Sequence, residues 1–306
     1  MNPDMLVPLL AAAVQSGTPI LFATLGEILT ERSGVLNLGV EGIMLVGALA
    51  AFVTARLTGS PLAGFLAGGL CGAGLAGVHG LVCLIFLGNQ VVSGLALTIL
   101  GTGLANYLGA PYVGLEAPGF FILALPLLSQ IPLLGPILFT QDPLVYTAYL
   151  MPPLLWVFLH RTRWGLGLRA VGEFPAAALA AGLRVKGYRW TGVLAGGGLM
   201  GFGGAYLSLA YTHLWANSLS AGRGWIAVAL VIFAFWRPGR AMVGAYLFGG
   251  VMAFQFRLQA SGTPLPSSLL LMLPYILTIL VLVFSSWKNK GDEAPAALGV
   301  NIEPSE

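Results

Sequence analysis

Long apolar runs separated by short polar breaks dominate the chain. A run of about 20 apolar residues can cross the ~30 Å hydrocarbon core of a membrane as a helix. Spans are predicted at Leu6–Leu29, Ile43–Val53 with the polar stretch before it, Pro61–Leu87, Val91–Val113, Pro143–His160, Trp190–Tyr211, Ala241–Phe256 and Ser267–Trp287. Trp225–Phe235 is too short to cross and predicts a half-helix. The expected fold is an all-α polytopic membrane protein with about nine transmembrane helices, within a range of about 8–10, some of them broken.

Three segments add to this pattern. Gly114–Asp142 is apolar but carries four prolines, which predicts an extracytoplasmic excursion that does not span. Residues 288–306 form a polar tail that is predicted to be disordered, which leaves residues 1–287 as a single transmembrane domain. Gly34–Ala48 and Gly222–Ala245 each begin with a polar turn and continue into an apolar run. Their likeness indicates either an inverted internal repeat or a chance similarity between two glycine-rich helices.

The basic residues cluster between Arg161 and Arg189, a loop that holds six of the 14 lysines and arginines. Short loops of this kind lie on the cytoplasmic side, so the loop orients the chain and places the N-terminus outside. Within it, Pro175 suits the first turn of a helix, the alanines that follow favour helix, and Gly182 can end it. So short a helix needs a surface to dock on. It is either a coupling helix that inserts into a cytoplasmic ATPase or an alanine-rich loop without a special role.

Composition excludes several classes of protein. The chain is 57% hydrophobic and 8% charged, whereas a soluble domain carries about 25% charged residues. The net charge of +3 follows the membrane topology, so no nucleic-acid partner is expected. The sequence has no GxxxxGK[ST], HExxH, CxxC or GxSxG motif. We therefore expect no catalytic residues, no metal site, no cofactor bound by this chain and no enzymatic activity.

Few polar side chains lie at membrane depth, and each is expected to face the protein interior or a water-filled pathway. Asn37 and Glu41 are four residues apart, so a continuous helix would carry both on one face. The candidate solute-binding residues are Asn37, Glu41, Asn89, Ser93 and Trp225. Amides both donate and accept hydrogen bonds, which suits a neutral, hydroxyl-rich solute. The alternatives are a structural bond at the broken helix for Asn37 and Glu41, and a solvated loop for Asn89.

Three stretches of the chain carry a family resemblance: GVLNLGVEGIMLVGA (Gly34–Ala48), TRWGLGLRAVGEFPAAALAAGLRV (Thr162–Val185) and GRGWIAVALVIFAFWRP (Gly222–Pro238). They resemble the membrane subunits of bacterial ABC importers for simple sugars and nucleosides, in the branched-chain amino acid/ribose-type permease superfamily. More narrowly, they are similar to the shorter of the two permeases in nucleoside uptake systems that use a basic-membrane-protein-type binding lipoprotein. The resemblance covers nearly the whole chain in order.

The resemblance implies a permease of the bacterial inner (plasma) membrane, multi-pass in lipid, that imports a nucleoside or simple sugar by alternating access. Its partners would be a cytoplasmic ABC ATPase that binds ATP and Mg²⁺, a second, longer permease in a heterodimer, and an extracytoplasmic solute-binding lipoprotein. The residues expected to couple to the ATPase are Arg169, Glu173, Pro175, Ala180, Ala181 and Gly182. The alternative is a secondary transporter or facilitator for a small polar solute that works without ATP.

Overall fold

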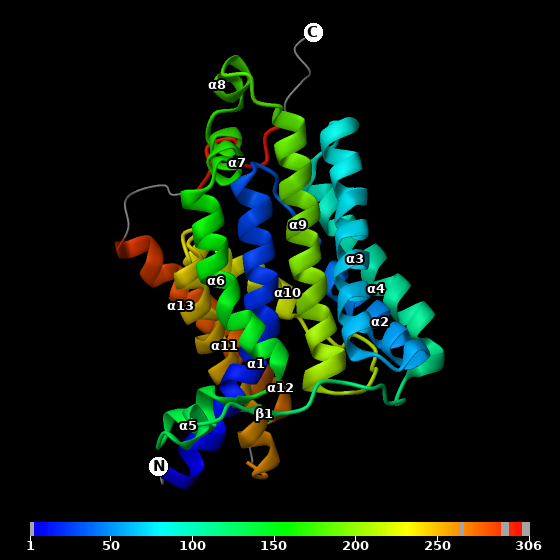
Figure 1. Ribbon diagram of the computed structural model, residues 1–306, viewed down its shortest axis with the longest axis vertical. Helices are drawn as coiled ribbons and strands as arrows, with labels where there is room; N and C mark the ends of the chain where they lie inside the picture. The colour runs from blue at the N-terminus through cyan, green and yellow to red at the C-terminus, as the bar shows by residue number, and fades with distance from the viewer. Residues whose placement is uncertain (1–2, 264–265, 289–293, 302–306) are drawn as a thin grey trace.

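The computed structural model describes residues 3–263, 266–288 and 294–301, which form a bundle of long helices (Figure 1). The long helices are α1 (Pro3–Arg32), α2 (Val40–Thr58), α3 (Pro61–Gly80), α4 (Gln90–Gly109), α6 (Pro143–Arg161), α9 (Val185–Tyr206) and α11 (Pro238–Ala260). The shorter helices are α5 (Leu134–Leu138), α7 (Arg163–Glu173), α8 (Pro175–Ala180), α10 (Arg223–Phe233), α12 (Ser267–Leu271) and α13 (Leu273–Lys288). Short π-helical turns extend α3 and α9, at Leu81–Ile85 and Leu207–Tyr211.

Seven helices of the described chain are long and apolar enough to cross a membrane, and two shorter apolar helices, Arg223–Phe233 and Ser267–Val281, accompany them. The predicted all-α polytopic fold with a half-helix is therefore confirmed. The N-terminus and α8 lie at opposite ends of the bundle (Figure 1). We call the end that carries α7 and α8 the basic end, and the opposite end the N-terminal end.

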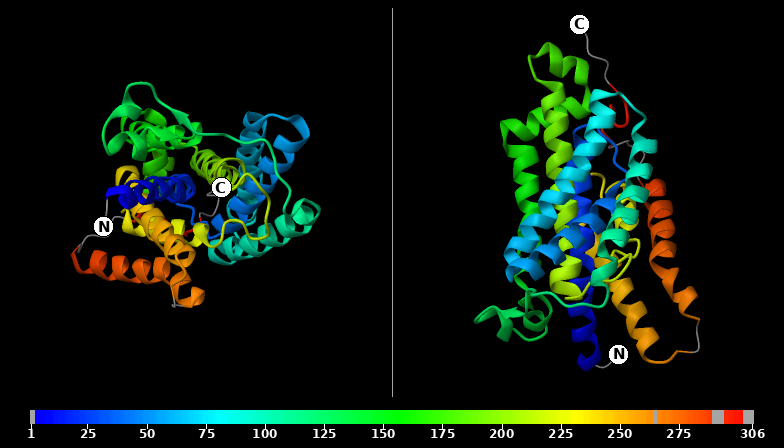
Figure 2. Two further views of the ribbon diagram at one scale, coloured as in Figure 1. Left: turned by 90° about the horizontal axis from the view of Figure 1, so that it is seen from below. Right: turned by 90° about the vertical axis from the view of Figure 1, so that its right-hand side faces the viewer.

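The proline-rich segment 114–142 lies at the N-terminal end and contains only short elements (Figures 1 and 2). Strands β1 (Leu123–Ala124) and β2 (Thr140–Gln141) pair antiparallel, and α5 lies between them in the chain. Proline fixes φ and lacks an N–H group, so repeated prolines prevent a long helix here. The excursion predicted from the sequence is present.

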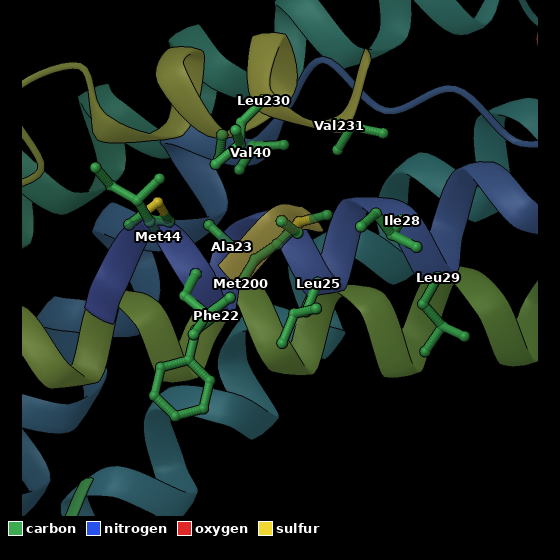
Figure 3. Close-up of a cluster of buried hydrophobic side chains, with 14 of the residues drawn as sticks. Phe22, Ala23, Leu25, Ile28, Leu29, Val40, Met44, Met200, Leu230 and Val231 are labelled. Atoms are coloured by element: carbon green, nitrogen blue, oxygen red, sulfur yellow. The ribbon is translucent and has the colours of Figure 1, made fainter. Parts of the chain in front are cut away.

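α1 runs through the bundle in contact with α9, α10 and α11. Figure 3 shows part of this apolar core, in which Leu25 of α1 lies near Met200 of α9, and Leu230 of α10 lies beside Val40 of α2. α3 and α9 approach each other backbone to backbone, because a Cβ on Gly72 would meet Gly197 O and the Cα of Gly201. Small residues permit such close contact between membrane helices.

The chain breaks between α1 and α2, where residues 33–39 form turns. α2 begins at Val40, so Asn37 lies in the loop and Glu41 lies in the first helical turn. The prediction that Asn37 and Glu41 share one helical face is therefore wrong. Gly34 provides the physical reason, because its φ of +87° is in the left-handed region that ends a helix.

The predicted disordered tail is a second correction. Within residues 288–306, residues 294–301 instead form two successive turns against the basic end, and Ala297 is buried there. Ala297 N donates a hydrogen bond to Gly172 O at 2.9 Å, and Leu298 N donates to Pro295 O at 2.9 Å. The stretch APAALGV (294–300) is apolar inside an otherwise polar tail, so it gains by burial against the helices. Residue 288 ends α13, and residues 289–293 and 302–306 lie outside the described residues.

Candidate functional site

One carboxyl group joins the start of α2 to the start of the half-helix α10. Glu41 Oε1 accepts hydrogen bonds from Ser220 Oγ at 2.5 Å and from Gly222 N at 2.8 Å. Glu41 Oε2 accepts from Gly224 N at 2.7 Å. A helix N-terminus carries unpaired N–H groups and the positive end of the helix dipole, and so binds anions. The carboxylate of Glu41 takes the place of such an anion and holds the two broken regions together.

Arg223, the first residue of α10, is a buried cation beside this junction. It is 3% exposed, its Nη1 donates to Ser220 O at 3.1 Å, and its guanidinium lies 5.4 Å from the ring centre of Tyr211. Its Nε has no hydrogen-bond partner among the described residues. The aromatic ring offsets part of the cost of burying the charge. The sequence analysis missed Arg223, although an arginine at the start of an apolar half-helix was the available signal.

Asn37 and Glu27 form a second buried polar contact, between the α1–α2 loop and α1. Asn37 N donates to Glu27 Oε1 at 3.1 Å, and Asn37 Oδ1 accepts from Gly39 N at 2.8 Å. Both side chains are 0% exposed. Glu27 Oε2 and Asn37 Nδ2 have no hydrogen-bond partner in the described part of the chain. Since buried polar atoms are nearly always paired, this contact marks a place where water or a ligand group would be stabilised.

Leu36, directly before Asn37, is fixed by α3 and α4. His79 Nε2 lies 3.0 Å from Leu36 O, and His79 Nδ1 lies 3.0 Å from Ser93 Oγ. Leu36 N donates to Gln90 Oε1 at 2.8 Å. Ser93, a candidate for solute binding, is therefore engaged within the chain. It orients His79, and His79 in turn binds Leu36 in the α1–α2 loop.

The remaining two candidates for solute binding differ in their surroundings. Asn89 is an exposed residue that caps α4, because its side chain accepts a hydrogen bond from Val92 N at 3.0 Å. This contact agrees with the alternative of a solvated loop. Trp225 lies in the first turn of α10 and is 39% exposed. The structure thus places Asn37, Glu41 and Trp225 at the two helix breaks, and Asn89 and Ser93 in the first turns of α4.

At the basic end, α8 projects beyond the long helices (Figures 1 and 2). Pro175 is its first residue and Gly182, just beyond it, has a φ of +81°, so the helix begins and ends near the predicted residues. Ala178 is buried against Val171 and Val185. The other face is open, and it includes Ala180 and Ala181. Phe174 and Leu179 are 65% and 49% exposed. Exposed apolar side chains on a supported helix are typical of a protein-docking surface.

Arg169 and Glu173, also expected to couple to an ATPase, make contacts inside the chain. Arg169 Nε donates to Leu159 O at 2.9 Å, which holds α7 against α6. Glu173 Oε1 lies 3.5 Å from Arg32 Nη1, and Glu173 Oε2 accepts from Ala296 N at 3.2 Å. Both residues belong to α7, a helix that the sequence analysis did not identify. Thr162 was its signal, because a threonine that accepts from the N–H group three residues on is a good N-cap.

Known relatives match nearly the whole chain. Residues 9–282 match the family described as branched-chain amino acid transport system / permease component. The putative glucose ABC transporter permease protein TsgC13 of Haloferax volcanii is 48% identical over 256 residues, which cover 82% of this chain and 78% of that protein. The nucleoside ABC transporter permease protein NupC of Lactococcus lactis subsp. cremoris is 37% identical, with 93% of each chain covered. The guanosine ABC transporter permease protein NupQ of Bacillus subtilis is 33% identical, with 94% of each covered.

The fold is also similar to a solved structure described as an inward-facing conformation of a putative metal-chelate type ABC transporter. The TM-score is 0.52 at 16% identity, and the match covers 92% of this chain and 85% of that chain. At this identity the likeness concerns the fold, and it agrees with the helical architecture described above.

These relatives confirm the resemblance seen in the three sequence stretches. They are ABC transporter permeases, so ATP hydrolysis belongs to a partner ATPase, and this chain is a transport subunit rather than an enzyme. With seven apolar helices in its described part, it is a multi-pass protein of the plasma membrane. The chain therefore belongs to the branched-chain amino acid transport system / permease component family of ABC transporter permeases.

Proposed function

We propose that this chain is one half of the transmembrane pathway of an importer that moves a nucleoside or a simple sugar into the cytoplasm by alternating access. The observation that carries the proposal is α8, an exposed apolar helix at the basic end. Loops rich in lysine and arginine lie in the cytoplasm, which puts α8 on the side of the ATPase. Relatives named as glucose and nucleoside permeases support the solute class.

Coupling begins at the open face of α8. The ATPase packs against the open face that carries Ala180 and Ala181, and closure of the ATPase dimer moves α8 as a unit. α8 rests on α7 and α9 through Ala178, so its movement is passed to the base of α9. α9 runs from there to the N-terminal end (Figure 1). A rigid helix of this length carries a displacement at the cytoplasmic side to the opposite side.

The polar groups at the two helix breaks suit a neutral solute. Both oxygens of Glu41 are occupied by Ser220, Gly222 and Gly224, so these three donors at the start of α10 are not free to bind an anionic solute. Trp225, in the first turn of α10, remains partly exposed. An indole ring stacks on the face of a base or a sugar ring. These features support a nucleoside or sugar over an anion.

The partners complete the pathway. A second, longer permease would face this chain across the partly exposed side of α10, and a lipoprotein would deliver the solute at the N-terminal end. The cytoplasmic ATPase supplies the free energy, with its own ATP and Mg²⁺.

The test is uptake by the complete transporter in proteoliposomes, with radiolabelled guanosine and glucose as probes. Saturable uptake of either probe that requires ATP is expected. Ala180→Asp, on the open face of α8, should abolish uptake while the protein stays in the membrane, because a charge prevents apolar docking. Thr58→Asp adds the same charge at the exposed last residue of α2, away from α8, and should transport normally. If neither guanosine nor glucose is taken up in an ATP-dependent way, the proposed solutes are wrong. If Ala180→Asp transports as well as the original protein, docking at α8 is wrong.

A further inference from the structure

Residues 294–301, which we call the C-terminal strap, lie across the basic end and touch parts of the chain far apart in sequence. One side of the strap is bound to the end of α7. Ala297 N donates to Gly172 O at 2.9 Å, and Ala296 N donates to Glu173 Oε2 at 3.2 Å. Glu173 is the last residue before the Phe174–Ala180 segment that carries the open surface of α8. The strap is therefore attached at the base of the proposed ATPase-docking helix.

The other side of the strap is bound to the connection between α3 and α4. Asn301 Nδ2 donates to Leu87 O at 2.6 Å and to Gly88 O at 3.0 Å. Asn301 Oδ1 accepts from Gln90 Nε2 at 3.0 Å. The amide of Asn301 thus makes three hydrogen bonds, and its oxygen and its nitrogen are both engaged. Such complete use of one side chain fixes the end of the strap in a single position.

Gln90 extends the connection to the α1–α2 break. Its Oε1 accepts from Leu36 N at 2.8 Å, and Leu36 directly precedes Asn37. Hydrogen bonds therefore lead from Glu173 through the strap and Gln90 to Leu36. Arg189 of α9 donates from Nη1 to Val300 O at 2.9 Å and so also holds the strap, one residue before Asn301.

The strap leaves α8 room to move. A cavity of 730 Å³ lies between them, and its walls include Phe174, Pro175 and Leu179 on one side and Ala297 and Val300 on the other. α8 can therefore shift relative to the strap, whereas the end of α7 is bonded to it. A displacement that reaches Glu173 is then passed along the strap rather than lost in the cavity.

We propose that the C-terminal strap links the ATPase-docking end of the chain to the α1–α2 break, and that Asn301 and Gln90 are its positioning residues. The proposal rests on the proposed coupling through α8. It assigns a transport role to residues beyond position 282, where the match to the family ends. Without the strap, ATP hydrolysis continues, but the break beside Asn37 no longer follows the movement of the docking end.

The first test uses the complete transporter in proteoliposomes and compares two shortened chains. One ends at Asp292 and lacks the strap, and the matched control ends at Asn301 and keeps it. The measured quantity is solute imported per ATP hydrolysed, with guanosine or glucose as the probe. The chain that ends at Asp292 should lower this ratio about threefold to thirtyfold, the range expected for residues that carry coupling. The control should match the full chain, and an equal ratio in both shortened chains would overturn the proposal.

A double-mutant cycle keeps the test sharp if the chain that ends at Asp292 fails to assemble. Asn301→Leu and Gln90→Leu each remove the bond between the two amides. If both residues act through that bond, the double variant should lower the ratio by less than the product of the single effects. Two outcomes would show that the bond between Asn301 and Gln90 does not couple ATP hydrolysis to transport. In one, the effects of the two variants multiply in the double variant; in the other, both single variants import as much solute per ATP as the original protein.

A third measurement does not depend on which solute is carried. Spin labels at Leu166→Cys on α7 and at Phe86→Cys, two exposed positions, in a background with Cys71→Ser and Cys83→Ser, report the distance between α7 and the α3–α4 connection by pulsed electron resonance. We expect one narrow distance distribution in the full chain, with and without ATP, and a broader one in Asn301→Leu. Equal widths would overturn the strap. If the full chain imports neither probe, the proposed solutes fail, and this measurement still decides on the strap.

Discussion

Glu41 and Glu27 are both buried carboxyl groups that accept hydrogen bonds from residues at a helix break, but the chain satisfies both oxygens of only one of them. Glu41 accepts from three donors, all at the start of α10. At the other contact, Glu27 Oε2 and Asn37 Nδ2 have no hydrogen-bond partner among the residues that the structure describes. The same chemistry thus yields a closed junction at Glu41 and an incomplete contact at Glu27.

The difference separates a structural role from a functional one. A saturated carboxylate has nothing left to offer a solute, so the structure favours the structural alternative for Glu41. An incomplete pair gains free energy from any water or ligand group that completes it. Asn37 is therefore the better candidate for a group that changes partner during transport.

The largest expected effect breaks the closed junction. Glu41→Leu leaves three donors without an acceptor, and two of them, Ser220 Oγ and Gly224 N, are buried. Each buried orphaned donor costs about 1–3 kcal/mol. The free energy of unfolding should fall by about 3 kcal/mol or more, seen as a lower melting temperature of the purified protein. Glu41→Gln, which keeps one oxygen, should lose less. An unchanged melting temperature together with a loss of solute affinity would make Glu41 a solute ligand.

A second variant probes the partly exposed side chain that follows the closed junction in α10. Trp225→Ala removes the partly exposed indole at the start of α10, whereas Trp225→Phe keeps an aromatic face. Stacking on a base is worth about 1–3 kcal/mol, so the KM for guanosine should rise about fivefold to a hundredfold in the alanine variant. The phenylalanine variant should stay close to the original KM. Equal KM values in all three proteins would remove Trp225 from the pathway.

The incomplete contact is tested by Asn37→Leu. This change orphans one donor, Gly39 N, but also removes the unpaired Nδ2, so stability should fall by only about 1 kcal/mol. Solute affinity or transport rate should change about tenfold, which corresponds to ~1.4 kcal/mol. Copurification of the ATPase should be unaffected. Unchanged transport would return Asn37 to a purely structural role and erase the contrast with Glu41.

The smallest effect is expected at Asp142, which caps α6 at the N-terminal end much as Glu41 caps α10. Asp142 Oδ1 accepts from Leu144 N at 2.9 Å and from Val145 N at 3.1 Å. Burial raises the pKa of Asp142 above its ordinary value. The folded state then keeps a proton to higher pH than the unfolded state, so this residue's contribution to stability falls as pH rises from the ordinary pKa through the raised one.

Asp142→Asn keeps a good N-cap without a titrating proton. The variant should lose this dependence on pH and differ at neutral pH by less than about 1 kcal/mol. Melting temperatures over a series of buffers from acidic to neutral check the prediction, with Asp142→Ala as the variant that loses the cap itself. The same slope in Asp142→Asn and in the original protein would assign the pH dependence to another group.

Regular signals in the sequence predicted the fold well. Apolar length identified the seven long spans of the described chain and the half-helix at α10, and Pro175 and Gly182 marked the ends of α8. The predicted span Ser267–Trp287 is instead divided into α12 and α13. The errors came from features that the spacing of apolar and polar residues does not encode. Asn37 and Glu41 have helical spacing, but Gly34 ends α1 in a left-handed conformation, and α2 begins only at Val40.

The strap shows the same limit. Composition indicated a polar tail, whereas the apolar stretch 294–300 is ordered by partners at Gly172, Arg189 and Leu87, which local sequence does not reveal. The candidate site follows this division too. Its residue types were evident from their rarity at membrane depth, but which of them are already satisfied depends on tertiary contacts such as that between Glu41 and Gly224.

The contact between Gly72 and Gly201 has a mechanical consequence. Helices kept apart by long side chains can slide as those side chains change rotamer, but main-chain atoms cannot swing aside. Gly47 of α2 meets Gly201 as well, so α2, α3 and α9 touch through their backbones at one level. We therefore expect α2, α3 and α9 to move as one rigid body, with conformational change confined to the loops that flank them.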